Sequence, residues 1–470
     1  MAEDDTPEDD FQEMLRRLFS GDGGQFDPEQ LARMTGGSVD PAALAGMMQQ
    51  LQGAFAAAQS GDGEISWDTA KTQALHIANQ GGLSVTDGQR TGLEGALSLA
   101  NLWLGESTTV PELTQAPRSI TRGQWVEATL PVWQELAAPV ATSIADALTR
   151  TLSEQAPDDM QGLVQGAGRM MRSIGGALFA TQLGQVVGRL STEVISGGDV
   201  GLPLMPPGDA VVLPQNFADF GRDLEIGTDQ LSLYLGVREL AHARLFRHAR
   251  WLRLLVTTQV ADFARGINVD TGALEDLAGR FDPAHPEELR AALESGALLP
   301  QHSEAQEQAL AKLENLLATI EGWVDVVTAD ATARLPQAGA IAETVRRRRA
   351  AGGPAEDALG ALVGLRLRPR RLREAAAMWR TVTDAVGIAA RDALWDYPDF
   401  MPTAADIDDP QALISRIRDR DQDRGDDTPV DEVDDAIARI LAGEQPASEP
   451  DQDAAASDDD SGEPEDPRPV

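Results

Sequence analysis

The sequence contains no cysteine, so disulfide bonds, thiolate metal sites and cysteine nucleophiles are all excluded. Aromatic residues are scarce, at 4% of the chain with two tyrosines, which indicates a core packed mainly from Ala, Leu and Val on helices. The chain also lacks the GxxxxGKS/T and GxGxxG patterns of phosphate-binding loops and the GxSxG pattern of serine hydrolases. What remains is 42% hydrophobic residues, enough for a large core, without a nucleotide-binding or nucleophilic motif.

Signals for export and membrane insertion are missing as well. The first ten residues, MAEDDTPEDD, have neither the basic nor the apolar region of a secretory signal. The longest uncharged apolar segment, residues 173–188, is too short and too rich in Gly and Gln to span a membrane. We therefore expect a cytoplasmic protein with no membrane partner.

The net charge of −37 is concentrated at the two ends of the chain. Residues 1–13 carry seven acids and no base, and residues 411–470 carry nineteen acids against six arginines. Such segments bury too little apolar area to fold, and the acidic excess argues against a nucleic-acid partner. We predict a flexible N-terminal arm (1–60), a helical domain (61–410) and a disordered acidic tail (411–470).

The middle of the chain predicts a mainly α fold. Capping boxes open three helices, at Thr86–Gln89, Thr121–Gln124 and Ser303–Gln306, and Pro131 should kink or divide the second of them. Residues 160–195 predict a long helix with small residues four apart on one side, Gly176, Ala180, Gly184 and Gly188, which favours close packing of another helix there. The apolar run at 211–213, set among prolines, predicts one small β element, a strand or hairpin.

A long helix over residues 231–256, capped by Thr228 or Asp229, follows this β element. Its broad apolar face also carries Arg238, Glu239 and His242. Leaving even one buried charge unpaired costs several kcal/mol, roughly, so these side chains must meet polar groups on a neighbouring helix or line a cavity. Function is expected at this cluster.

A second helix, from Ser303 to about Arg334, offers the matching polar groups. Glu321 and Asp325 lie on or beside its apolar stripe of Leu310, Leu313, Leu317, Ile320 and Val324. Mutual pairing is the least costly way to satisfy both sets of buried charges. We therefore expect the two helices to lie side by side.

The motif RELAH at residues 238–242 differs at one position from HExxH, in which two histidines hold zinc and the glutamate activates water. With other stretches in collinear order from residue 65 to 410, it resembles an actinobacterial zincin-like family of zinc-dependent metalloproteases or hydrolases. The stretches are VRELAHARLFRHARWL, ISWDTAKTQALHIA, RGQWVEATLPVW, GLPLMPPGDAVVLPQNFADFG, IEGWVDVV and ETVRRRRAAGGPAEDALGALVGL. The resemblance implies a large multi-helix zincin-like domain with zinc as cofactor and a peptide or protein as substrate or partner.

By this resemblance His242 is the second zinc ligand, Glu239 the catalytic general base and Glu321 the downstream ligand, with Asp325 as a further possible ligand. Two positions depart from the pattern. Arg238 stands where the first zinc-binding His belongs, and a guanidinium has no acceptor to bind a cation. Trp323 stands where relatives with an EGHAD-like segment carry His. Only two of the usual three ligands remain, unless Asp325 supplies the third.

Two functions therefore stay open. One is a zinc-dependent hydrolase with Glu239 polarising a metal-bound water, and the other is a non-catalytic binding or scaffold protein that keeps the fold. Since Arg238 carries a permanent positive charge, we favour a bidentate ion pair that joins the two helices in place of a metal, with Arg238 close to Glu321, Asp325 or Glu239.

The run Arg346–Arg349 has two readings of its own. The first is a helix end whose arginines complement the helix dipole and pair with Glu343, stopped by Gly352. The second is a cationic patch that contacts the chain's own acidic tail, or else nucleic acid or anionic lipid.

Overall fold

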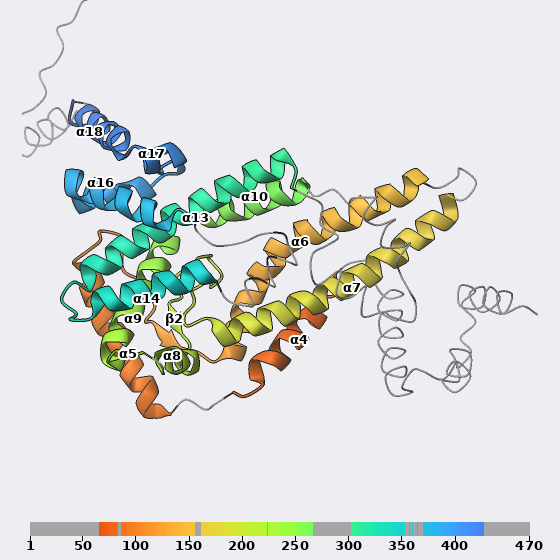
Figure 1. Cartoon of the computed structure of the whole chain (residues 1–470), viewed down its shortest axis with the longest axis horizontal. Helices are drawn as coiled ribbons and strands as arrows, with labels where there is room; N and C mark the ends of the chain where they lie inside the picture. Colours follow the sequence, from red (N-terminus) through yellow and green to blue (C-terminus); the bar gives the residue numbers. More distant parts are fainter. Residues whose placement is uncertain are drawn as a thin grey trace, which may run out of the picture. The chain divides into compact units, whose positions relative to one another are not determined.

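Figure 1 shows a computed structural model of the chain. The structure describes residues 65–82, 86–155, 161–222, 224–266, 302–352, 357, 360, 364 and 370–426, without the side chains of 144–175, 178 and 423–426. The chain divides into two units, residues 1–414 and 415–470. The predicted arm (1–60) and most of the predicted tail lie outside the described residues.

The described part of the chain is mainly helical, as predicted. Before the central helix it comprises α4 (Trp67–Asn79), α5 (Asp87–Gly105), β1 (Arg118–Ser119), α6 (Arg122–Gln155), α7 (Gln161–Glu193), β2 (Val211–Val212) and α8 (Pro214–Gly221). The rest comprises α9 (Thr228–His248), α10 (Trp251–Arg265), α13 (Glu304–Ala331), α14 (Ala338–Ala351), α16 (Leu372–Asp392), the 3-10 turns η2 (Ala393–Trp395) and η3 (Pro398–Phe400), α17 (Ala404–Asp408) and α18 (Pro410–Asp426). No described helix is long and apolar enough to cross a membrane.

The three predicted capping boxes are present at the first turns of α5, α6 and α13. In the last of them, Ser303 Oγ accepts from the Gln306 backbone N–H, and the Gln306 side chain accepts from the Ser303 N–H. These reciprocal bonds satisfy amide groups that a helix start would otherwise leave free. Pro131 does not divide α6, because the helix continues through both Pro131 and Pro139.

Small residues of α7 allow α4 to approach closely, as predicted. A Cβ added at Gly184 would lie 2.5 Å from the Ala70 carbonyl oxygen, and one at Gly188 would lie 2.8 Å from Ile77 Cβ. Since real Cβ atoms do not come this near to other atoms, only glycine fits at these contacts. Figure 1 shows α4 lying along the C-terminal half of α7, the half nearer to β2.

The small β element lies where predicted, but it is no hairpin. β2 pairs in parallel with β1, with Arg118 opposite Val211 and Ser119 opposite Val212. Ser196 adds an isolated antiparallel bridge to Val212. Parallel strands require a long crossover connection, here all of α6 and α7, so neighbouring residues could not supply the partner.

The central helix is shorter than predicted. α9 begins after Gly227, rather than after Thr228 or Asp229, and ends at His248. Ala249 leaves the helical conformation at φ −88° and ψ 70°, and α10 starts at Trp251, so the predicted helix 231–256 is two helices. α9 packs against α5, α13 and α14, and most of its middle is buried.

The predicted tail starts with a helix. We expected disorder from residue 411, but α18 runs from Pro410 to Asp426. The prediction relied on the number of acidic residues and overlooked the apolar residues at the start of this segment, where Leu413 and Ile414 are almost completely buried. Residues 427–470 lie outside the described part.

Candidate functional site

The site forms where α9 meets α13, as the sequence predicted. Arg238 Nη2 donates a hydrogen bond to Glu321 Oε2, and this ion pair joins the two helices. The Glu321 side chain is fully buried and that of Arg238 is 10% exposed. The expected pairing of Arg238 with a carboxylate of α13 is therefore confirmed.

A second guanidinium faces the same carboxylate. Arg349 Nη2, from α14, lies 3.7 Å from Glu321 Oε1, an oxygen with no hydrogen-bond partner among the described residues. The Arg238 contact is therefore not the bidentate pair that we expected, since Glu321 is shared between two arginines. Burial alone would raise the pKa of Glu321, but Arg238 and Arg349 outweigh it and hold that pKa below its usual value.

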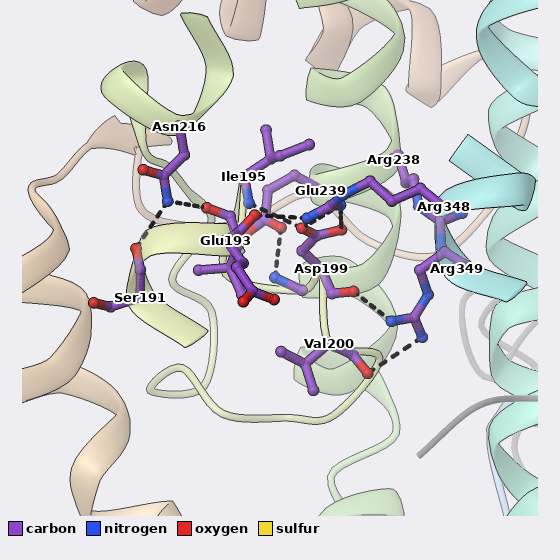
Figure 2. A network of polar contacts seen from close by, with 12 residues as sticks. Ser191, Glu193, Ile195, Asp199, Val200, Asn216, Arg238, Glu239, Arg348 and Arg349 are labelled. Carbon is purple, nitrogen blue, oxygen red and sulfur yellow. Dashed lines mark hydrogen bonds and ion pairs between the residues drawn. The ribbon is translucent and has the colours of Figure 1, made fainter. Parts of the chain in front are cut away.

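Arg349 and its neighbour Arg348 also hold the loop between α7 and β2 (Figure 2). Arg349 donates to the backbone carbonyls of Asp199 and Val200, at 2.6 and 3.2 Å. Arg348 Nη1 lies 2.9 and 2.7 Å from the two carboxylate oxygens of Asp199. The loop is thus tied to α14 by charge-assisted hydrogen bonds.

The remaining arginines of this run are also engaged. Arg346 donates to both oxygens of Asp325, at 3.2 and 2.8 Å, so Asp325 pairs with α14 and not with Arg238. Arg347 pairs with Glu343 one turn earlier, as the helix-end reading predicts. Gly352, at φ +67°, ends α14 where predicted. Contact of the acidic tail with these arginines stays a prediction.

Glu239 anchors the same loop from the side of α9. Its carboxylate accepts from the backbone N–H of Gly198 at 2.7 Å and from that of Val211, in β2, at 2.9 Å. Burial raises the pKa of Glu239 to about 7, although these hydrogen bonds oppose the shift. The carboxyl group therefore changes its protonation near neutral pH.

His242 lies one helical turn after Arg238. Burial lowers the pKa of its imidazole to about 4, so the ring is neutral at pH 7. A Cβ at Gly198 would lie 2.5 Å from Nδ1, and the Phe246 ring centroid is 4.7 Å away. Nε2 has no hydrogen-bond partner among the described residues.

Glu239 and His242 both line a cleft of about 410 Å³. This volume falls in the range of small-molecule sites. Apolar side chains form much of its wall: Leu202, Leu204, Met205 and Phe246. Three arginines from the end of α9 and the start of α10 also line the cleft: Arg247, Arg250 and Arg253.

The structure does not bring Trp323 to this cluster. Its indole Nε1 donates to Asp392 Oδ1 at 2.9 Å, and its ring packs edge-on against Trp395 at 6.2 Å. Asp392 also accepts from the hydroxyl of Thr108 and the N–H of Thr109, each at 2.7 Å. Trp323 therefore belongs to this separate buried network.

A family model described as zincin-like metallopeptidase matches residues 65–414. The chain belongs to the zincin-like metallopeptidase family. Its fold is similar to the crystal structure of a presumed hydrolase with a novel fold from Chloroflexus aurantiacus. The TM-score is 0.52 at 18% identity, over 75% of this chain and 99% of the other. No curated protein matches the chain.

Zinc, which the family name implies, does not fit the side chains of this family member. Glu321 faces two guanidiniums, and both oxygens of Glu239 accept backbone hydrogen bonds. Asp325 is held by Arg346, so of these four side chains His242 alone has neither a guanidinium partner nor, at Nε2, a hydrogen bond from a described residue. Among the described residues, no three His, Asp or Glu side chains are grouped so that they could hold a metal ion.

Sequence reasoning missed the part that Asp199 and Arg349 play in this site. The sequence pattern identifies Arg349 only as one member of a basic run, and Asp199 lies in the Gly-rich loop 196–201. Nothing in the local pattern of either residue indicates the other, because 150 positions separate them. The close glycines at 197, 198 and 201 are the one available signal, since they let the loop lie directly on the polar side chains.

Proposed function

We propose that this chain is a non-catalytic binding member of the zincin-like metallopeptidase family, in which Arg238 takes the place of the metal. The buried ion pair between Arg238 and Glu321 carries this proposal. The absence of cysteine fits a cytoplasmic location, which stays part of the proposal.

A buried carboxylate needs a cation, and here that cation is covalently part of the chain. Glu321 is fully buried, so without a positive neighbour its ionised form would be strongly unfavourable. Arg238 and Arg349 supply that charge permanently, because guanidinium groups do not lose a proton in proteins. The helices α9 and α13 are thereby joined in a way that does not depend on metal supply.

The same arginines oppose a divalent cation. At an effective dielectric constant of 20, two unit charges 4 Å apart interact by about 4 kcal/mol, and the value doubles for a dication. Zinc beside Glu321 would meet this repulsion from Arg238, with Arg349 adding more. A zinc-dependent hydrolase is therefore the less favoured reading of this particular sequence.

Metal analysis of the purified full chain tests the proposal. Inductively coupled plasma mass spectrometry should find zinc well below one atom per chain in the native protein after exposure to equimolar zinc. In the Arg238→His variant, where an imidazole replaces the guanidinium, zinc binding should increase and should be lost again on adding His242→Ala. Stoichiometric zinc in the native protein, removed by His242→Ala, would overturn the proposal and restore the peptidase reading.

One observation favours hydrolysis as the second candidate. Glu239 lines the cleft and has a pKa of about 7, which suits a group that takes up and releases protons. Under this reading Glu239→Gln would abolish an activity that the native protein shows on peptide or ester substrates.

A further inference from the structure

The acidic and basic groups that line the cleft do not balance. Of the two acids, Glu239 accepts backbone hydrogen bonds, and Asp209 forms an ion pair with Arg118 at 2.8 Å. On the basic side, Arg253 pairs with Glu135 at 2.8 Å. The other two arginines of the lining are Arg247 and Arg250.

Arg247 and Arg250 have no ion pair with any residue that the structure describes, and both line the cleft. Arg247 lies across Gly208, whose added Cβ would be 3.3 Å from Arg247 Cδ. Gly208 has φ +90°, a conformation that other residues rarely adopt, so the loop leaves room there for the arginine. The cleft thus presents two guanidiniums without an ionic partner in the described structure.

The rest of the wall is apolar. Leu202, Leu204 and Met205 come from the loop before β2, and Phe246 comes from α9. Leu202 and Leu204 are almost completely buried and leave little surface for a ligand, whereas Phe246 is half-buried and accessible. A ligand that suits both features has an apolar body and one anionic end.

We propose that this cleft binds a small organic anion, with its carboxylate or phosphate end on Arg247 and Arg250 and its apolar body against Phe246 and Met205. The inference rests on the proposed binding function and names its ligand class. Guanidinium groups bind both kinds of oxyanion through paired N–H donors, so the two share one chemistry.

Isothermal titration calorimetry on the full chain tests this, in low-salt buffer containing a chelator. The probes are 4-phenylbutyrate, its neutral amide 4-phenylbutyramide and 2-phenylethyl phosphate. One of the two anions should bind about tenfold more tightly than the amide, and the anion that binds better identifies the headgroup. The double variant Arg247→Gln with Arg250→Gln should lose about tenfold in affinity for that anion and leave binding of the amide unchanged.

Two further variants separate charge from apolar contact. Phe246→Ala should weaken binding of the anion and of the amide by the same factor. Arg265→Gln is the matched control, since Arg265 is on α10, is 73% exposed and is no part of the lining. Its affinities should equal those of the native chain.

Equal affinity for anion and amide, or no binding of any probe at millimolar concentration, would overturn the inference. Because the chelator removes free zinc, the outcome is independent of the metal analysis. Zinc in the native protein together with anion binding would refute the proposed function alone. A zinc-free protein that binds no probe would refute the ligand class alone.

Discussion

Replacing Arg238 with methionine removes the guanidinium and keeps a long side chain in its place. Glu321 would then be buried with Arg349, at 3.7 Å, as its remaining positive neighbour. Breaking a buried ion pair by removing one partner costs about 3–5 kcal/mol. Since Arg349 compensates part of the charge, we expect Arg238→Met to lower the free energy of unfolding by about 3 kcal/mol.

This loss converts into a shift of the melting temperature. The unfolding entropy is about 2.1 cal/mol/K per residue, or about 0.7 kcal/mol/K for a domain the size of the family match at 65–414. A loss of about 3 kcal/mol then corresponds to a fall of about 4 °C. Differential scanning calorimetry of the full chain resolves such a change.

The double variant Arg238→Met with Glu321→Leu distinguishes the ion pair from simple packing. It removes both charges, so it should melt at a higher temperature than Arg238→Met alone. Arg265→Met serves as the exposed control and should shift the melting temperature by less than about 1 °C. A single variant as stable as the native chain, or a double variant less stable than Arg238→Met, would refute the reasoning.

Three further predictions concern the surroundings of the site. Burial opposes ionisation of Asp199, but Arg348 and Arg349 outweigh burial and lower the pKa of this carboxyl group. The stability that ionised Asp199 contributes to the fold is therefore complete above a pH of about 4, and it is lost as the pH falls through the lowered pKa. The difference in melting temperature between native chain and Asp199→Asn should therefore shrink between pH 5 and pH 2, as scanning calorimetry can follow. Trp323→Phe deletes the indole donor to Asp392 and should cost about 1–3 kcal/mol in chemical denaturation without changing anion affinity. Gly198→Ala forces the loop off α9 and should cost about 1–3 kcal/mol, whereas Gly95→Ala, in an exposed part of α5 with no atom within 4 Å, should not destabilise.

The helical architecture and the meeting of α9 with α13 could be predicted because each rests on a local pattern. Capping boxes and apolar stripes fix where these helices start and which faces they bury. Arg238 on one stripe and Glu321 on the other then require each other, since a buried charge needs a partner. The contact across 83 positions thus followed from two local observations.

Other features depend on tertiary contacts that leave no local pattern. β1 is two residues long, Arg118 and Ser119, neither of them apolar, and its partner follows α7. Trp323 is close to Glu321 in sequence, yet its indole N–H donates a hydrogen bond to Asp392 on another helix. The family pattern places a residue in order along the chain, whereas the direction of its side chain depends on the neighbours that surround it.

One charge distribution connects the ion pair with the cleft. Arg238 and Arg349 outnumber the single carboxylate between them, and Arg247 and Arg250 add positive charge nearby without an ionic partner among the described residues. Even with Glu239 ionised, positive charge remains in excess around the cleft, and the neutral imidazole beside Glu239 does not change this balance. An excess of this sign repels a divalent cation and attracts an oxyanion. The poor fit to zinc and the preference for an organic anion therefore have the same physical origin.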